Sequence, residues 1–213
     1  MIKPIYKEKI LFEFLEKYVV NKWIHEFSQI DEKYKNNISV IEEELKSKFD
    51  SICKLGEELQ NQGVKGEIKY IYFSFLRTSL LKNKGEFRID LYDENWFLDK
   101  AECSINIELD FIYGSFFQHM KELKEKKKEY AHMKKVRSTN MNFRVITDMD
   151  IEDIMLGEAD KYHILAVEFM KEIIENLIEV PFYKKMKKLE EINIMAGEYM
   201  DASEIIYPKQ DNN

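Results

Sequence analysis

The chain has 213 residues, of which 34% are charged and 13% aromatic, and its formal net charge at pH 7 is −7. A chain of this length buries a sizeable core, so we expect a single domain over residues 1–213. The negative charge disfavours general binding to nucleic acid or to anionic membranes. Cys53 and Cys103 are too few for a disulfide framework. Because a signal-peptide pattern and a membrane-spanning apolar run are also missing, the sequence predicts a soluble cytoplasmic protein.

The N-terminal segment is predicted to be helical. Apolar residues recur at steps of three and four between Pro4 and Ile30, and a narrower apolar stripe follows from Ser39 to about Gln62. Asn36–Asn37 favours a turn between them, which would make residues 1–63 a helical hairpin, whereas a helical 31–37 would give one long helix. The narrow stripe resembles a coiled-coil seam and consists of Ile38, Ile41, Leu45, Phe49, Ile52 and Leu59.

The clearest strand pattern is a predicted β-hairpin over about 68–92. Its first part is rich in aromatic and aliphatic residues, its loop at 82–85 has turn chemistry, and its second part alternates between apolar and polar side chains. A four-residue loop would pair Phe75 with Tyr92 across the two strands. This register would place six residues of interest on one outward face, namely Phe73, Phe75, Arg77, Arg88, Asp90 and Tyr92.

Strict alternation of apolar and polar residues predicts a third strand over about 102–108. The period then changes to that of a helix from Leu109 to about Met133. Residues 143–146 are predicted to form a short strand or an extended linker.

The C-terminal part begins with a helix that follows Thr147 or Asp148 as its cap. A further strand is predicted over about 192–196. Together the segments predict an α+β fold, in which an antiparallel sheet of three to four strands is packed by long helices from both ends of the chain. The α+β core would occupy residues 64–207, and residues 208–213 would form a flexible tail.

Two pairs of residues have the helical spacing of metal ligands. Glu129 precedes His132 by three residues, and Asp160 precedes His163 by the same step. A carboxylate and an imidazole with this spacing bind one metal in di-iron bundles. Such a site also needs acids from two further helices, so a core position for His163 and a surface position for His132 are the simpler interpretation. We therefore expect no metal and no other cofactor.

The sequence contains no nucleophile elbow, no zinc-protease helix and no phosphate-binding loop. Catalytic residues can still be brought together by folding, so the sequence leaves open whether the protein is an enzyme.

Two functions are compatible with the predicted outward face of the hairpin. The simpler interpretation is that helices cover this face. The absence of catalytic motifs then favours a non-catalytic protein-interaction module, with the stripe from Ser39 to Gln62 as the candidate homodimer seam. Alternatively, the protein is an enzyme or a small-ligand binder that uses a pocket between the sheet and the helices. The candidate contacts of such a groove are Phe73, Phe75, Arg77, Arg88, Asp90 and Tyr92. We expect the first function, with a protein partner or self-association and without nucleic acid or membrane.

Overall fold

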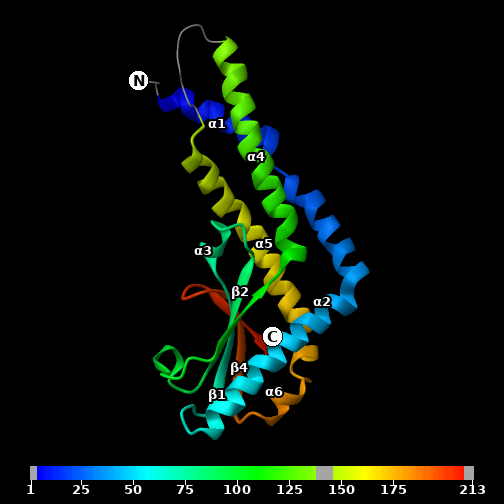
Figure 1. Ribbon diagram of the computed structural model, residues 1–213. Coiled ribbons are helices and arrows are strands. Elements are labelled where there is room, and N and C mark those ends of the chain that lie inside the picture. The colour runs from blue at the N-terminus through cyan, green and yellow to red at the C-terminus, as the bar shows by residue number, and fades with distance from the viewer. Residues whose placement is uncertain (1–3, 138–145, 209–213) are drawn as a thin grey trace, which may run out of the picture. The chain divides into compact units, whose positions relative to one another are not determined.

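The computed structural model describes the backbone of residues 4–137 and 146–208, and side chains over 8–129 and 146–208 (Figure 1). The chain divides into two compact units, each made of two separate stretches. A helical unit comprises Met1–Lys33 and Phe111–Tyr162, and a sheet unit comprises Tyr34–Asp110 and His163–Asn213. Most of the strand predicted over 143–146, and the tail from residue 209, lie outside the described residues.

The helical unit is built from parts of four helices, which are α1 (Pro4–Tyr18), α2 (Lys22–Asn61), α4 (Asp110–Arg137) and α5 (Asp148–Leu177). The single helix predicted from Pro4 to Ile30 is wrong, because the chain turns between α1 and α2. Asn21 adopts a left-handed conformation in this turn, with φ of 64°, which asparagine tolerates better than most residues.

Helix α2 continues through the predicted turn. It bends at Asn37, where φ is −128° and ψ is 18°. The polar residues Asn36–Asn37 therefore mark a kink and do not make the turn of a helical hairpin. The alternative prediction, that 31–37 stays helical, is confirmed.

The sheet unit contains five strands in the order β3-β2-β1-β4-β5. Their bounds are β1 (Ile68–Phe75), β2 (Glu86–Tyr92), β3 (Ser104–Glu108), β4 (Lys188–Glu198) and β5 (Ser203–Tyr207). The predicted hairpin and third strand are confirmed, as is the strand at 192–196, which forms the middle of β4. The α+β class is also confirmed. The prediction of a purely antiparallel sheet is wrong, because β1 and β4 run parallel and the sheet is mixed.

The predicted register of the hairpin is wrong. Phe75 pairs with Phe87 and not with Tyr92, a shift of five residues along the partner strand. The chain leaves β1 early and forms a helical turn, α3 (Arg77–Leu80). The hydroxyl of Ser79 donates a hydrogen bond to the Lys84 carbonyl (2.7 Å) and closes this connection. Because side chains alternate along a strand, an odd shift moves every residue of β1 to the opposite face relative to β2.

Within the sheet unit, residues 34–61 of α2, residues 163–177 of α5, and α6 (Pro181–Lys185) lie on one side of the sheet (Figure 1). The ring of Phe49 in α2 stacks on Phe73 of β1 and on Tyr183 of α6, at 5.8 Å in each case. Three residues of the stripe from Ser39 to Gln62 are buried, namely Leu45, Phe49 and Ile52. These three residues are therefore covered within the chain itself, whereas Ile38 at the start of the stripe is 43% exposed.

None of the helices in the described part of the chain is long and apolar enough to cross a membrane.

Candidate functional site

The observed register separates the residues of the predicted site. Phe73 and Phe75 lie on the face that the helices cover, and both are buried. The ring of Phe75 contacts the imidazole of His163 on α5, with 3.4 Å between the ring centroids. The prediction that these two phenylalanines share a face with Arg88 and Asp90 is wrong, because the register is shifted by an odd number of residues.

The other face of the sheet, called the open face below, carries Tyr70, Tyr72, Ser74, Arg88, Asp90 and Tyr92. Arg88 donates from Nε to both carboxylate oxygens of Asp90 (2.8 and 3.0 Å) and from Nη2 to Glu102 (3.0 Å). Burial raises the pKa of Asp90, and the Arg88 guanidinium opposes this shift. The charged groups of the open face are thus largely neutralised by one another.

Arg77 does not lie with these residues. It belongs to α3 and donates from Nε and Nη2 to the two carboxylate oxygens of Glu198, at 2.6 and 2.7 Å. The three charged residues expected to line a groove, Arg77, Arg88 and Asp90, are all engaged in ion pairs within the chain.

The loop that connects β2 to β3 covers part of the open face. This aromatic loop, residues 93–103, contains the short helix η1 (Trp96–Leu98). Trp96 packs edge-on against Tyr70, with ring centroids 3.9 Å apart, and Phe97 packs against Tyr92 at 5.3 Å. Figure 1 shows the loop on the side of the sheet away from α2 and α6.

The tip of the aromatic loop projects apolar side chains into solvent. Phe97 is 40% exposed and Leu98 is 83% exposed. Trp96 adopts a left-handed backbone conformation, with φ of 55°, which is costly for a bulky residue by about 1–3 kcal/mol. Such strain persists only where the surroundings fix the backbone, and it is concentrated at functional sites.

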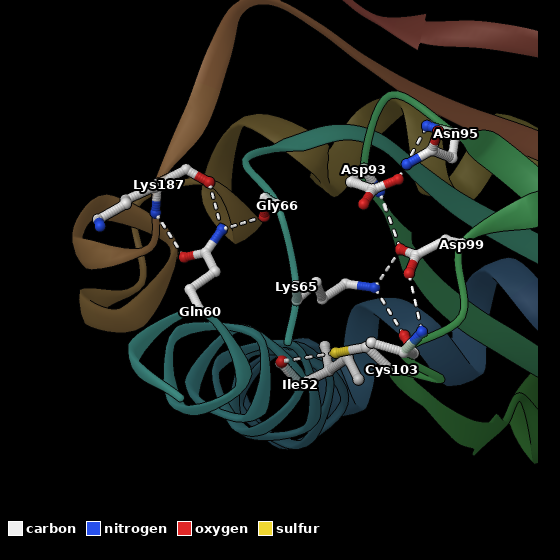
Figure 2. Close-up of polar contacts among 10 residues, drawn as sticks. Ile52, Gln60, Lys65, Gly66, Asp93, Asn95, Asp99, Cys103 and Lys187 are labelled. Atoms are coloured by element: carbon white, nitrogen blue, oxygen red, sulfur yellow. Dashed lines mark hydrogen bonds and ion pairs between the residues drawn. The ribbon is translucent and has the colours of Figure 1, made fainter. Parts of the chain in front are cut away.

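A buried polar cluster fixes the base of the loop (Figure 2). Lys65 donates from Nζ to Asp99 Oδ2 (2.5 Å) and to the Ala101 carbonyl (2.8 Å). The Asp99 carboxylate also accepts from the backbone N–H groups of Asp93 (3.1 Å) and Ala101 (2.9 Å). The Asp93 carboxylate in turn accepts from the N–H of Asn95 (2.8 Å). The two carboxylate oxygens of Asp99 thus bind the backbone at both ends of the loop, at Asp93 and at Ala101.

A second contact in Figure 2 secures the segment from which Lys65 projects. The side-chain amide of Gln60, near the end of α2, donates to the carbonyls of Gly66 (2.9 Å) and Lys187 (2.8 Å) and accepts from the N–H of Lys187 (2.9 Å). The start of β1, the start of β4 and the end of α2 are therefore joined beside the base of the loop.

Of the two predicted metal-ligand pairs, only Asp160 and His163 lie wholly within the part of the chain whose side chains are described. Asp160 is exposed, whereas burial and the nearby Arg77 lower the pKa of His163 to about 3. The side chain of His132 lies outside the described residues, so its pairing with Glu129 stays a prediction. Among the described residues there is no group of three or more His, Cys, Asp or Glu side chains that could hold a metal ion.

No protein-family model, curated protein or solved structure matches this chain. The candidate site therefore comes from the structure of the chain itself. It consists of the aromatic loop and the open face.

Proposed function

We propose that this protein is a non-catalytic protein-interaction module that binds a protein partner through the aromatic loop and the adjoining open face. The observation that carries the proposal is the combination of a solvent-exposed apolar tip, Phe97 and Leu98, with a base fixed by the buried Lys65–Asp99 ion pair. An exposed apolar tip gains free energy when a partner covers it.

The rigid base supports this function because binding then orders little of the chain. A loop that is already held in its bound conformation avoids much of the entropy cost of association. The backbone strain at Trp96 also supports the proposal, since strained residues are concentrated at functional sites.

The composition of the site also suits a protein partner. Tyrosine, tryptophan, phenylalanine and arginine are enriched at protein interfaces. Phe97 and Leu98 would form the centre of the contact, Tyr70 and Tyr92 would support it from the strands, and Arg88 would lie at its rim. The alternative of a substrate pocket between sheet and helices has less support, because Arg77 and Arg88 are already paired with carboxylates of the chain.

A cytoplasmic location is part of the same proposal. Cys53 and Cys103 are both buried free thiols, which suits a reducing compartment.

The test is photo-crosslinking from two matched positions. A photoreactive amino acid replaces Leu98 in one variant and Leu81 in the control, since Leu81 is also well exposed (61%) but lies in the β1–β2 connection. Both variants are irradiated in a lysate of the organism that encodes the chain. A distinct protein crosslinked from position 98, and not from position 81, is expected. Equal labelling from both positions, or none from position 98, would contradict the proposal.

Light scattering after size exclusion distinguishes a second copy of the chain from another protein. If self-association uses the site, the mass of the wild type will rise with concentration, and Leu98→Ser will lower it to that of one chain while Leu81→Ser will not. A single-chain mass for all three identifies the partner as a different protein.

A further inference from the structure

The helical unit contains a polar cluster to which each of its four helices contributes one group. These groups are the backbone carbonyl of Tyr18 at the end of α1, Glu26 of α2, His119 of α4 and Tyr162 of α5. His119 and Tyr162 are buried. The cluster adjoins the turn that connects α1 to α2.

His119 connects two of these groups through its two ring nitrogens. Nε2 lies 2.9 Å from the Tyr18 carbonyl oxygen, and Nδ1 lies 3.4 Å from Glu26 Oε1. The hydroxyl of Tyr162 donates to the other carboxylate oxygen, Glu26 Oε2. Both oxygens of Glu26 therefore face a polar group of another helix.

The Tyr18 carbonyl assigns one of the protons of the cluster. A carbonyl oxygen only accepts, so Nε2 of His119 carries a hydrogen. If the imidazole is neutral, its Nδ1 presents a lone pair, which repels an ionised Glu26 carboxylate. A favourable contact therefore requires one proton between Nδ1 and Oε1, held either by an imidazolium or by a protonated carboxyl group.

The charges around the cluster favour retention of this proton. Burial raises the pKa of Glu26, and the Tyr162 hydroxyl and the His119 ring oppose this shift. Two further acids, Glu122 on α4 and Glu158 on α5, raise it again. Glu158 also forms an ion pair with Lys161, with 2.6 Å between Oε1 and Nζ. From α1, the group that faces His119 is the Tyr18 carbonyl, which bears only a partial negative charge.

We propose that Glu26 and His119 form a pH-sensitive latch, in which one shared proton holds the α1–α2 turn against α4 and α5 and its loss at higher pH loosens the turn. In the open form at neutral pH an exposed glutamate is ionised and a histidine is mostly neutral. Closing the latch therefore takes up about one proton. The equilibrium constant for opening should rise up to about tenfold per pH unit over the range in which the open form has lost this proton and the closed form still holds it.

The test combines two measurements on the full chain between about pH 6 and pH 9. Nitrogen NMR of the His119 ring reports protonation of Nδ1 and Nε2, and carbon NMR of the Glu26 carboxyl group reports whether that group holds the shared proton. Amide exchange protection at Val19 and Val20, whose N–H groups donate to the Leu15 carbonyl, reports opening of the turn. The latch predicts a fall in protection, up to about tenfold per pH unit, that levels off where the closed form loses the shared proton from Nδ1 or from the Glu26 carboxyl group.

Two variants separate the latch from general effects of pH. Glu26→Gln supplies an amide that can donate to neutral Nδ1, so the pH dependence of protection should vanish. His25→Gln, an exposed neighbour on α2, should retain it. Unchanged pH dependence in Glu26→Gln would overturn the latch. If that variant fails to fold, a wild type in which both Nδ1 and the Glu26 carboxyl group stay unprotonated over the whole range would overturn it equally.

Discussion

Lys65 Nζ lies 2.5 Å from Asp99 Oδ2, and the two side chains are only 0% and 3% exposed. The pair spans the segment between α2 and β1 on one side and the end of the aromatic loop on the other (Figure 2). Further hydrogen bonds to Asp99 compensate the cost of burying its charge. The exposed tip of the loop is therefore held on a rigid support.

Removal of one partner of this pair should be costly. Lys65→Met leaves the Asp99 carboxylate buried without its cation, so we expect a loss of about 3–5 kcal/mol in the free energy of unfolding. Arg77→Ala is the control, because its ion pair with Glu198 is largely at the surface and should contribute less than about 1 kcal/mol. Urea unfolding measures both. Similar losses for the two variants would show that the buried pair has no special role.

The same pair should make the sheet unit sensitive to acid. Burial alone would raise the pKa of Asp99, but Lys65 and the N–H groups of Asp93 and Ala101 outweigh it, and the pKa is lowered from 3.8. A lowered carboxyl pKa contributes stability that is present above the pKa of the unfolded chain and is lost as the pH falls below it. Urea midpoints measured below about pH 4 should therefore decline more steeply for the wild type than for Asp99→Asn. Parallel pH profiles would contradict this assignment.

Substitution by alanine should change the stability of the protein in opposite directions at two glycines. A Cβ at Gly197 in β4 would lie 2.2 Å from the Ala202 carbonyl oxygen, whereas a Cβ at Gly114 in α4 meets nothing within 4 Å. Gly197→Ala should destabilise the protein by at least about 1–3 kcal/mol. Gly114→Ala should stabilise it by about 0.5–1 kcal/mol, because alanine favours a helix interior. Thermal unfolding of the two variants checks the contrast, and a neutral Gly197→Ala would contradict it.

The two cysteines should be inert in the folded protein. Burial raises the pKa of the Cys103 thiol to about 12, and it also raises the pKa of Cys53. The thiolate is the reactive form, so alkylation of native protein at pH 8 should be very slow at both sites. Mass spectrometry should show rapid labelling of both after unfolding in urea. Fast modification of either thiol under native conditions would contradict the burial of that residue.

Local patterns predicted several elements closely. The helix expected after Thr147 is α5 (Asp148–Leu177), and the Thr147 hydroxyl accepts a hydrogen bond from the Asp150 N–H (3.1 Å), as a helix cap does. The alternation of residues 86–92 likewise predicted β2. These features depend on neighbours in the sequence, so periodicity and capping chemistry reveal them.

Features that depend on distant residues were not predicted. The parallel pairing of β1 with β4 joins strands more than a hundred residues apart, and no local pattern selects it. The hairpin register depended on the helical turn between β1 and β2, which the hydroxyl of Ser79 stabilises. Lys65 could not be identified as a buried residue, because lysine is rarely buried without a partner and Asp99 lies 34 residues away. The aromatic loop was consequently missed as a site.

The most direct test of the proposed function is the affinity of the protein that crosslinks from position 98. We predict that Phe97→Ser combined with Leu98→Ser raises its dissociation constant at least about tenfold, as expected for the centre of an interface. Leu81→Ser, which removes another well-exposed leucine elsewhere in the sheet unit, should leave the constant unchanged. An unchanged affinity for the double variant, with its fold intact by circular dichroism, would contradict the assignment of the aromatic loop as the binding site.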